Sequence, residues 1–286
     1  MSGPPGSPSP PGLPVPHTAA GRAGLAALLR APGRALIALD FDGTLAPIVA
    51  DPRAARAHPA AVGALRRLAP LTGTLAVITG RPALEAVEYG RFELVPGLIV
   101  LGHYGRERWA AGTLTAPPAA PGVAAARREL PGVLAAAGAP AGTRTEDKRD
   151  ALAVHTRNAA RPGETLELLR GPLARLAERT GLVLEPGRFV IELRPPGADK
   201  GAALENLAAE RRPGAILFCG DDLGDVPAFR AVRSLRAAGT AGLAVCSGSA
   251  EVAGLAKQAD LIVHGPAGVV ALLGSLADAF ASVHRG

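Results

Sequence analysis

The sequence predicts an α/β protein in which a doubly wound parallel sheet carries a smaller inserted α+β module. Short apolar strands alternate with helices near both ends of the chain, a rhythm typical of parallel sheets. The middle of the chain instead predicts the order α-β-β-α-β-β, which suits a small antiparallel sheet with two helices. With 286 residues the chain is long enough to build both units.

The first part of the chain is expected to begin with a disordered tail at residues 1–20, because this stretch is rich in Pro, Gly and Ser. Residues 21–111 then open the parallel-sheet core. Apolar runs and helical spacing predict, in order, a helix at 23–30, a strand at 35–39, a helix at 58–69, a strand at 74–78, a helix ending near 87 and a strand at 98–101.

The middle of the chain, residues 112–192, is expected to form the inserted domain. Leu166, Leu169, Leu173 and Leu176 share one face of its strongest helix. The expected elements are a helix at 121–137, a hairpin of 143–147 with 151–157, the amphipathic helix at 164–179, and a hairpin of 182–184 with 189–193 about Pro186 and Gly187.

From residue 193 to 286 the first rhythm returns. Asp199 is expected to cap a helix that ends near 210. After it we expect a strand at 215–219, a helix at 225–236, a strand at 243–246, a helix at 251–258 and a final strand at 261–263.

Composition narrows the classes of function. Aromatic residues make up 3% of the chain, and the formal charge of +6 comes from scattered arginines, so nothing favours nucleic-acid binding. Cys219 and Cys246 lie in apolar runs, which argues against a disulfide framework. No apolar stretch approaching a membrane span and no signal peptide are recognised, which predicts a cytoplasmic protein without a membrane partner.

Chemistry-bearing residues stand at four points where strands end or helices begin. Asp40 and Asp42 follow the 35–39 strand, Thr79 follows the 74–78 strand, and Lys200 opens a helix. The fourth point follows the 215–219 strand and contains Asp221, Asp222 and Asp225. In a parallel sheet these points meet at one edge, where such folds bind their ligands.

The four groups complement one another chemically. Converging carboxylates repel each other and call for a cation, and ligands that are all oxygen favour Mg²⁺. Lys200 and Thr79 would then supply a positive charge and a hydrogen bond to phosphoryl oxygens. A metal, a carboxylate nucleophile and a second carboxylate that moves protons make a phosphoryl-transfer site.

Each signal also has a simpler reading. The Asp40–Asp42 segment is compatible with an acidic turn, and Asp225 with a helix cap. Thr79 alone predicts a satisfied turn hydroxyl, and Lys200 alone a solvated residue at a helix start. The occurrence of all four in chain order favours the site.

Together, LDFDGT, Thr79, Lys200 and GDDLGD resemble the four motifs of the haloacid dehalogenase-like phosphatases. The resemblance implies that Asp40 is the nucleophile that becomes an aspartyl-phosphate. It also implies that Asp42 protonates the leaving alcohol and then deprotonates water, with Thr79 and Lys200 holding phosphoryl oxygens. Mg²⁺ would be held by Asp40, the Asp42 backbone carbonyl and Asp221, with Asp225 supporting the metal site.

Over residues 33–286 the chain further resembles the trehalose-6-phosphate phosphatases. The segments that carry this resemblance are LDFDGTLAPI, ITGR, GHYGRERW, EDKRDALAVHTR and IELRPPGADKGAAL. The inserted module then matches the cap of that family, which closes over the sugar. Arg149-Asp150 departs from the family pattern after the cap lysine, and GDDLGD departs from its more frequent Thr-Asp-Glu form.

Polar residues of the expected cap hairpins are the candidates for reading the sugar. The resemblance favours Lys148 and Glu192, because an acid in ELRP and a lysine in EDK contact the sugar in that family. Arg157 and Arg194 are further candidates, with structural ion pairs as the alternative. The remaining polar residues have structural readings: packing is favoured for His155, His103 and Tyr104, and a solvated turn for Glu185.

The leading hypothesis is Mg²⁺-dependent hydrolysis of trehalose 6-phosphate. Alternatives are a phosphatase for another sugar phosphate, such as sucrose phosphate or mannosyl-3-phosphoglycerate, and a phosphomannomutase-like enzyme. A different class is a non-catalytic protein that binds a sugar phosphate and regulates a partner, the trehalose-phosphate synthase. The oligomeric state is not determined by the sequence.

Overall fold

The computed structural model describes residues 12–118, 120–187, 189–248 and 253–284, and it divides the chain into two compact units. Unit 1 combines Met1–Thr115 with Asp199–Gly286, and unit 2 is Ala116–Ala198. The sequence places the corresponding boundaries near residues 112 and 192. Each unit is described separately below.

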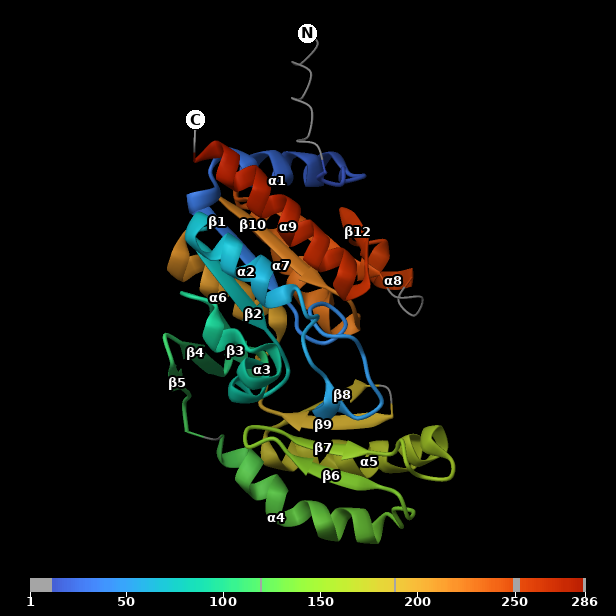
Figure 1. Ribbon diagram of the computed structural model, residues 1–286. Helices are drawn as coiled ribbons and strands as arrows, with labels where there is room; N and C mark the ends of the chain where they lie inside the picture. The colour runs from blue at the N-terminus through green and yellow to red at the C-terminus, as the bar shows by residue number, and fades with distance from the viewer. Residues whose placement is uncertain (1–11, 119, 188, 249–252, 285–286) are drawn as a thin grey trace. The chain divides into compact units, whose positions relative to one another are not determined.

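Unit 1 is built on an eight-stranded sheet in the order β12-β11-β10-β1-β2-β3-β4-β5 (Figure 1). Its first six strands are parallel, and β4 and β5 are added antiparallel. The strands are β1 (Ala35–Leu39), β2 (Thr74–Ile78), β3 (Ile99–Gly102), β4 (Glu107–Ala110), β5 (Thr113–Thr115), β10 (Ala215–Gly220), β11 (Ala241–Gly248) and β12 (Leu261–His264).

Helices cover both faces of this sheet, so the expected doubly wound α/β fold is confirmed. Strands β1, β2 and β10 are apolar along nearly their whole length because both of their faces are buried. One face packs against α1 (Ala19–Arg30), α2 (Ala61–Leu68), α3 (Ala83–Gly90) and α9 (Gly265–Val283). The other face packs against α6 (Lys200–Arg211), α7 (Val226–Ala237) and α8 (Ala253–Ala256).

Unit 2 follows the expected α-β-β-α-β-β order. Its antiparallel sheet has the order β6-β7-β9-β8, and the Leu stripe of α5 packs on one face of that sheet. Its elements are α4 (Pro121–Ala136), β6 (Arg144–Asp147), β7 (Leu152–His155), α5 (Pro162–Thr180), β8 (Val183–Gly187) and β9 (Val190–Arg194).

Several expectations for individual elements are wrong. Strands β4 and β5 and helix α9 were not expected. Helix α9 is long and apolar enough to cross a membrane by length and composition, contrary to the sequence expectation, but its buried face packs in the core of unit 1. Pro186 and Gly187 belong to β8 and pair with β9 rather than forming the turn.

Two further expected segments, the tail and the helix at 251–258, lie partly outside the described residues. The first eleven residues of the expected tail lie outside them, whereas Leu13 is buried and Thr18 caps α1, so the tail does not extend to residue 20. Of the helix expected at 251–258, only Ala253–Ala256 is described as helical, and residues 249–252 lie outside the described part.

Candidate active site

The parallel strands β2, β1 and β10 are neighbours, and their carboxyl ends bring three predicted site residues to one edge of the sheet. Asp40 follows β1, Thr79 follows β2 and Asp221 follows β10. The chain continues from β1 to β2 on one side and returns to β10 on the other, so this edge is a topological switch point. Open α/β sheets bind ligands at such points.

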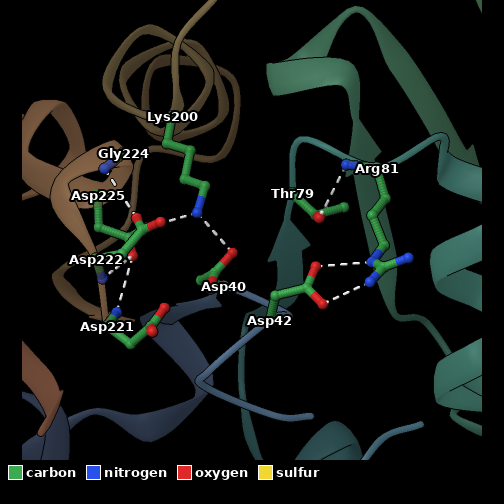
Figure 2. A network of polar contacts seen from close by, with 9 residues as sticks. All are labelled: Asp40, Asp42, Thr79, Arg81, Lys200, Asp221, Asp222, Gly224 and Asp225. Carbon is green, nitrogen blue, oxygen red and sulfur yellow. Dashed lines mark hydrogen bonds and ion pairs between the residues drawn. The ribbon is translucent and has the colours of Figure 1, made fainter. Parts of the chain in front are cut away.

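Lys200 connects two of the carboxylates (Figure 2). Asp199 accepts a hydrogen bond from Ala202 N–H and so begins α6, which places Lys200 in the first turn. Lys200 Nζ donates to Asp40 Oδ1 at 2.6 Å and to Asp225 Oδ1 at 2.7 Å. All three side chains are almost completely buried. Lys200 is therefore a buried counter-ion, and the reading as a solvated lysine is wrong.

The turn after β10 is organised by Asp225. Its Oδ2 atom accepts hydrogen bonds from the backbone N–H groups of Asp221, at 2.8 Å, and Asp222, at 3.2 Å. Gly43 packs directly against the Asp221 carboxylate: a Cβ added at Gly43 would lie 1.9 Å from Asp221 Oδ2. Only glycine is compatible with this approach and with the positive φ of 77° at this position.

The three carboxylates form a cluster that fits a hard cation. One oxygen from each of Asp40, Asp221 and Asp225 lies within 4.8 Å of the others. Asp221 Oδ1 is buried and has no hydrogen-bond partner among the residues that the structure describes, which is costly unless a ligand satisfies it. Ligands that are all oxygen suit Mg²⁺. Both Asp225 oxygens already accept hydrogen bonds, which favours a supporting role for this residue.

Burial dominates the electrostatics of the cluster. It raises the pKa of Asp40 well above its ordinary value, and Lys200 opposes this rise. Burial together with the charges of Asp222 and Asp225 raises the pKa of Asp221 to about 8. The pKa of Asp225 is raised by burial as well. Perturbed carboxyls clustered at a sheet edge are typical of functional sites.

Asp42 lies in a different environment from Asp40. Its carboxylate points toward Arg81, which donates from Nε to Oδ2 and from Nη2 to Oδ1, both at 2.7 Å (Figure 2). The Arg81 guanidinium also lies 5.6 Å from the centre of the Phe41 ring and 5.4 Å from that of Tyr89. These contacts hold the guanidinium, and through it the direction of the Asp42 carboxylate.

Arg81 is a site residue that sequence reasoning missed, although it lies in the ITGR segment. The pattern of a strand followed by Thr-Gly-Arg marks the turn, but nothing local pairs Arg81 with an aspartate 39 positions earlier. Thr79 Oγ1 accepts from Arg81 N–H at 3.1 Å, so the hydroxyl hydrogen points elsewhere and can be donated.

The sugar-reading candidates lie in unit 2. Lys148 Nζ donates to Glu192 Oε2 at 2.8 Å, whereas Glu192 Oε1 is buried without a hydrogen-bond partner in the described part of the chain. Glu192 alternates along β9 with Ile191 and Leu193, which pack on the helices, so it faces away from them.

Arg194, His155 and Arg157 are the other polar residues of unit 2 that the sequence singles out. Arg194 pairs with Glu185 at 2.8 Å; Glu185 is exposed, as expected, but it lies in β8 rather than in a turn. His155 is a half-buried strand residue whose Nε2 lies 2.8 Å from Glu146. Arg157 is exposed beyond the end of β7.

Comparison with known proteins gives a family. The trehalose-phosphatase family model matches residues 38–260. A trehalose-phosphate phosphatase of Mycobacterium marinum is 33% identical over 260 residues, which cover 85% of this chain and 62% of the relative. The chain therefore spans less than two thirds of that relative's length.

Solved structures confirm the fold class. The C-terminal domain of trehalose-6-phosphate phosphatase from C. albicans superimposes with a TM-score of 0.73 at 21% identity, covering 93% of this chain and 99% of that one. A haloacid dehalogenase-like hydrolase from Bacteroides thetaiotaomicron gives a TM-score of 0.56 at 18% identity, covering 87% and 98%. With the family model matching most of its length, this chain belongs to the trehalose-phosphatase family.

Proposed function

We propose that this protein hydrolyses trehalose 6-phosphate to trehalose and phosphate. The observation that carries the proposal is the meeting of Asp40, Asp42, Thr79, Lys200 and Asp221 at one edge of the unit 1 sheet. Family membership supports trehalose 6-phosphate as the substrate.

In this proposal Asp40 attacks phosphorus and forms an aspartyl-phosphate, which water then hydrolyses. Lys200 directs the Asp40 carboxylate and opposes the rise in its pKa that burial causes, and the Thr79 hydroxyl donates to a phosphoryl oxygen. Asp42 donates a proton to the leaving sugar oxygen and takes one from the attacking water. Arg81 holds the Asp42 carboxylate in one direction through two hydrogen bonds, which suits both roles.

The carboxylate cluster is the proposed Mg²⁺ site. Asp40, Asp221 and the Asp42 backbone carbonyl would hold the ion, and Asp225 would support it by fixing Asp221 and Lys200. A bound Mg²⁺ would neutralise charge on the phosphoryl oxygens.

Unit 2 is the proposed cap that recognises the sugar. Glu192 Oε1, which has no hydrogen-bond partner within the described ranges, can accept a hydrogen bond from a sugar hydroxyl, and Lys148 can donate to another. Arg157 and Arg194 are proposed as further contributors to sugar binding. Arg194 is expected to contribute less, because it already has a carboxylate partner. A cytoplasmic location remains a prediction from the sequence.

A substrate panel tests the proposal. Phosphate release should be faster with trehalose 6-phosphate than with sucrose 6-phosphate, mannosyl-3-phosphoglycerate or glucose 6-phosphate, and EDTA should abolish it. Asp40→Asn should remove turnover while leaving thermal unfolding similar. A faster rival substrate would overturn the sugar assignment. A fully inactive protein that still binds trehalose 6-phosphate would favour the non-catalytic regulator of a synthase instead.

A further inference from the structure

The turn between β3 and β4, residues 103–106, contains two successive non-glycine residues with left-handed backbone conformation. His103 has a φ of 47° and Tyr104 a φ of 58°. This conformation is unfavourable for residues with a Cβ, and it persists only where surrounding contacts fix it. The reason for the turn therefore lies in what it contacts.

Both left-handed residues hold the loop that carries Thr79 and Arg81. The backbone N–H of His103 donates to the Arg81 carbonyl at 2.9 Å, and that of Tyr104 donates to the Thr79 carbonyl at 3.0 Å. Between these bonds the Tyr104 ring packs on Gly80, where an added Cβ would lie 2.7 Å from Tyr104 Oη. The turn thus fixes the backbone on both sides of Gly80.

Glu107 closes the same arrangement from β4. Its side chain is 3% exposed, and its Oε2 atom accepts a hydrogen bond at 2.7 Å from the N–H of Ala83, the first residue of α3. Its Oε1 atom lies 3.8 Å from His103 Nε2. Pro82 supplies no side-chain cap for α3. The Glu107 carboxylate therefore caps the N-terminus of α3 from β4, in place of a local N-cap residue. At this position its negative charge also interacts favourably with the helix dipole.

We propose that Glu107 is a positioning residue for Arg81. It fixes the backbone two residues beyond Arg81 through Ala83 and lies beside His103, whose N–H holds the Arg81 carbonyl. The direction of the Arg81 guanidinium, and with it that of Asp42, is set by this anchorage. Because Glu107 is buried, it acts through Arg81 and not on the substrate. The inference rests on the proposed function only for its effect on turnover.

A double-mutant cycle tests this inference. Glu107→Ala, Arg81→Ala and the double variant are compared in p-nitrophenyl phosphate hydrolysis with Mg²⁺ and in thermal unfolding. Glu107→Ala should lower kcat by about tenfold or more with little change in KM. In the Arg81→Ala background the same substitution should change kcat by less than about twofold. Glu107→Gln, which keeps an acceptor oxygen, should recover most activity. Glu88→Gln, an exposed change on α3, is the control.

The contrary outcomes are distinct. Equal kcat losses from Glu107→Ala with and without Arg81 would overturn the inference, because a merely structural residue acts independently. If Glu107→Ala does not fold, the cycle is run with Glu107→Asp, which retains the charge but shortens the reach to Ala83 N–H. If the wild type hydrolyses no phosphate ester, the proposed function fails. The inference is then decided by thermal unfolding, where additive losses for Glu107 and Arg81 would overturn it.

Discussion

Replacing Lys200 by Met should destabilise the metal-free protein strongly. Lys200 is 6% exposed and is the cation that contacts Asp40 and Asp225 at 2.6 and 2.7 Å. Removing one partner of a buried ion pair costs about 3–5 kcal/mol, because it leaves uncompensated charge. For a domain of this size each kcal/mol lowers Tm by about 2–4 °C, so the expected decrease is about 6–20 °C.

The pH dependence of this loss has a definite sign. Burial raises the pKa of Asp40 and Asp225 above their ordinary values, and Lys200 opposes the rise. Without Lys200 both carboxyls should bind protons more tightly in the folded state than in the unfolded chain. A raised carboxyl pKa stabilises the fold at low pH, and this stabilisation is lost as pH rises through the folded pKa. The deficit of Lys200→Met should therefore be largest near neutral pH and shrink as pH falls toward 5.

Thermal unfolding in EDTA between pH 5 and 8 measures both effects. Lys257→Met is the matched control, because Lys257 is exposed. Added Mg²⁺ should recover part of the loss, since a cation then faces the same carboxylates. The reasoning is refuted if Lys200→Met and Lys257→Met have the same Tm in EDTA, or if the deficit of Lys200→Met grows as pH falls.

Three other measurements address separate parts of the site. Burial and neighbouring carboxylates raise the pKa of Asp221 to about 8, so Mg²⁺ must displace a proton from this carboxyl below that pH. Calorimetry should therefore show that the Mg²⁺ affinity rises by up to about tenfold per pH unit between pH 6 and 8, with proton release. An affinity that is independent of pH would contradict this expectation. Arg81→Ala should lower kcat by about a hundredfold, because the Asp42 carboxylate loses the two hydrogen bonds from Arg81. An unchanged kcat in steady-state kinetics would contradict the role of Arg81 in directing Asp42. Glu192→Ala should raise KM for trehalose 6-phosphate and leave KM for p-nitrophenyl phosphate unchanged. Equal changes in the two KM values would exclude a role of Glu192 in recognising the sugar.

Local pattern accounts for the elements that the sequence predicts well. Strands β1, β2 and β10 are apolar runs ended by turn residues, and the Leu stripe of α5 has helical spacing. Each signal lies within a few residues of the chain, so no long-range information is needed. The order of these strands and helices also predicts which edge of the sheet the motif residues share.

The missed elements have no such local signal. Helix α9 is rich in Ala and Gly and has a single charged residue, so its sequence lacks a polar face from which to read helical periodicity. Strand β4 begins with two charged residues, and only its antiparallel pairing with β3 and β5 makes it a strand. Glu107 is buried at its start.

By itself the sequence determined the fold class and the residue types of the site, because each motif residue directly follows a strand or begins a helix in the chain. Only the tertiary structure decided which charged groups meet. Lys200 lies 160 positions from Asp40, Arg81 lies 39 from Asp42, and Lys148 lies 44 from Glu192. Such pairings depend on sheet register and backbone turns, which no local pattern encodes. For that reason Asp40 and Asp42, two residues apart in one motif, have different partners and different proposed tasks.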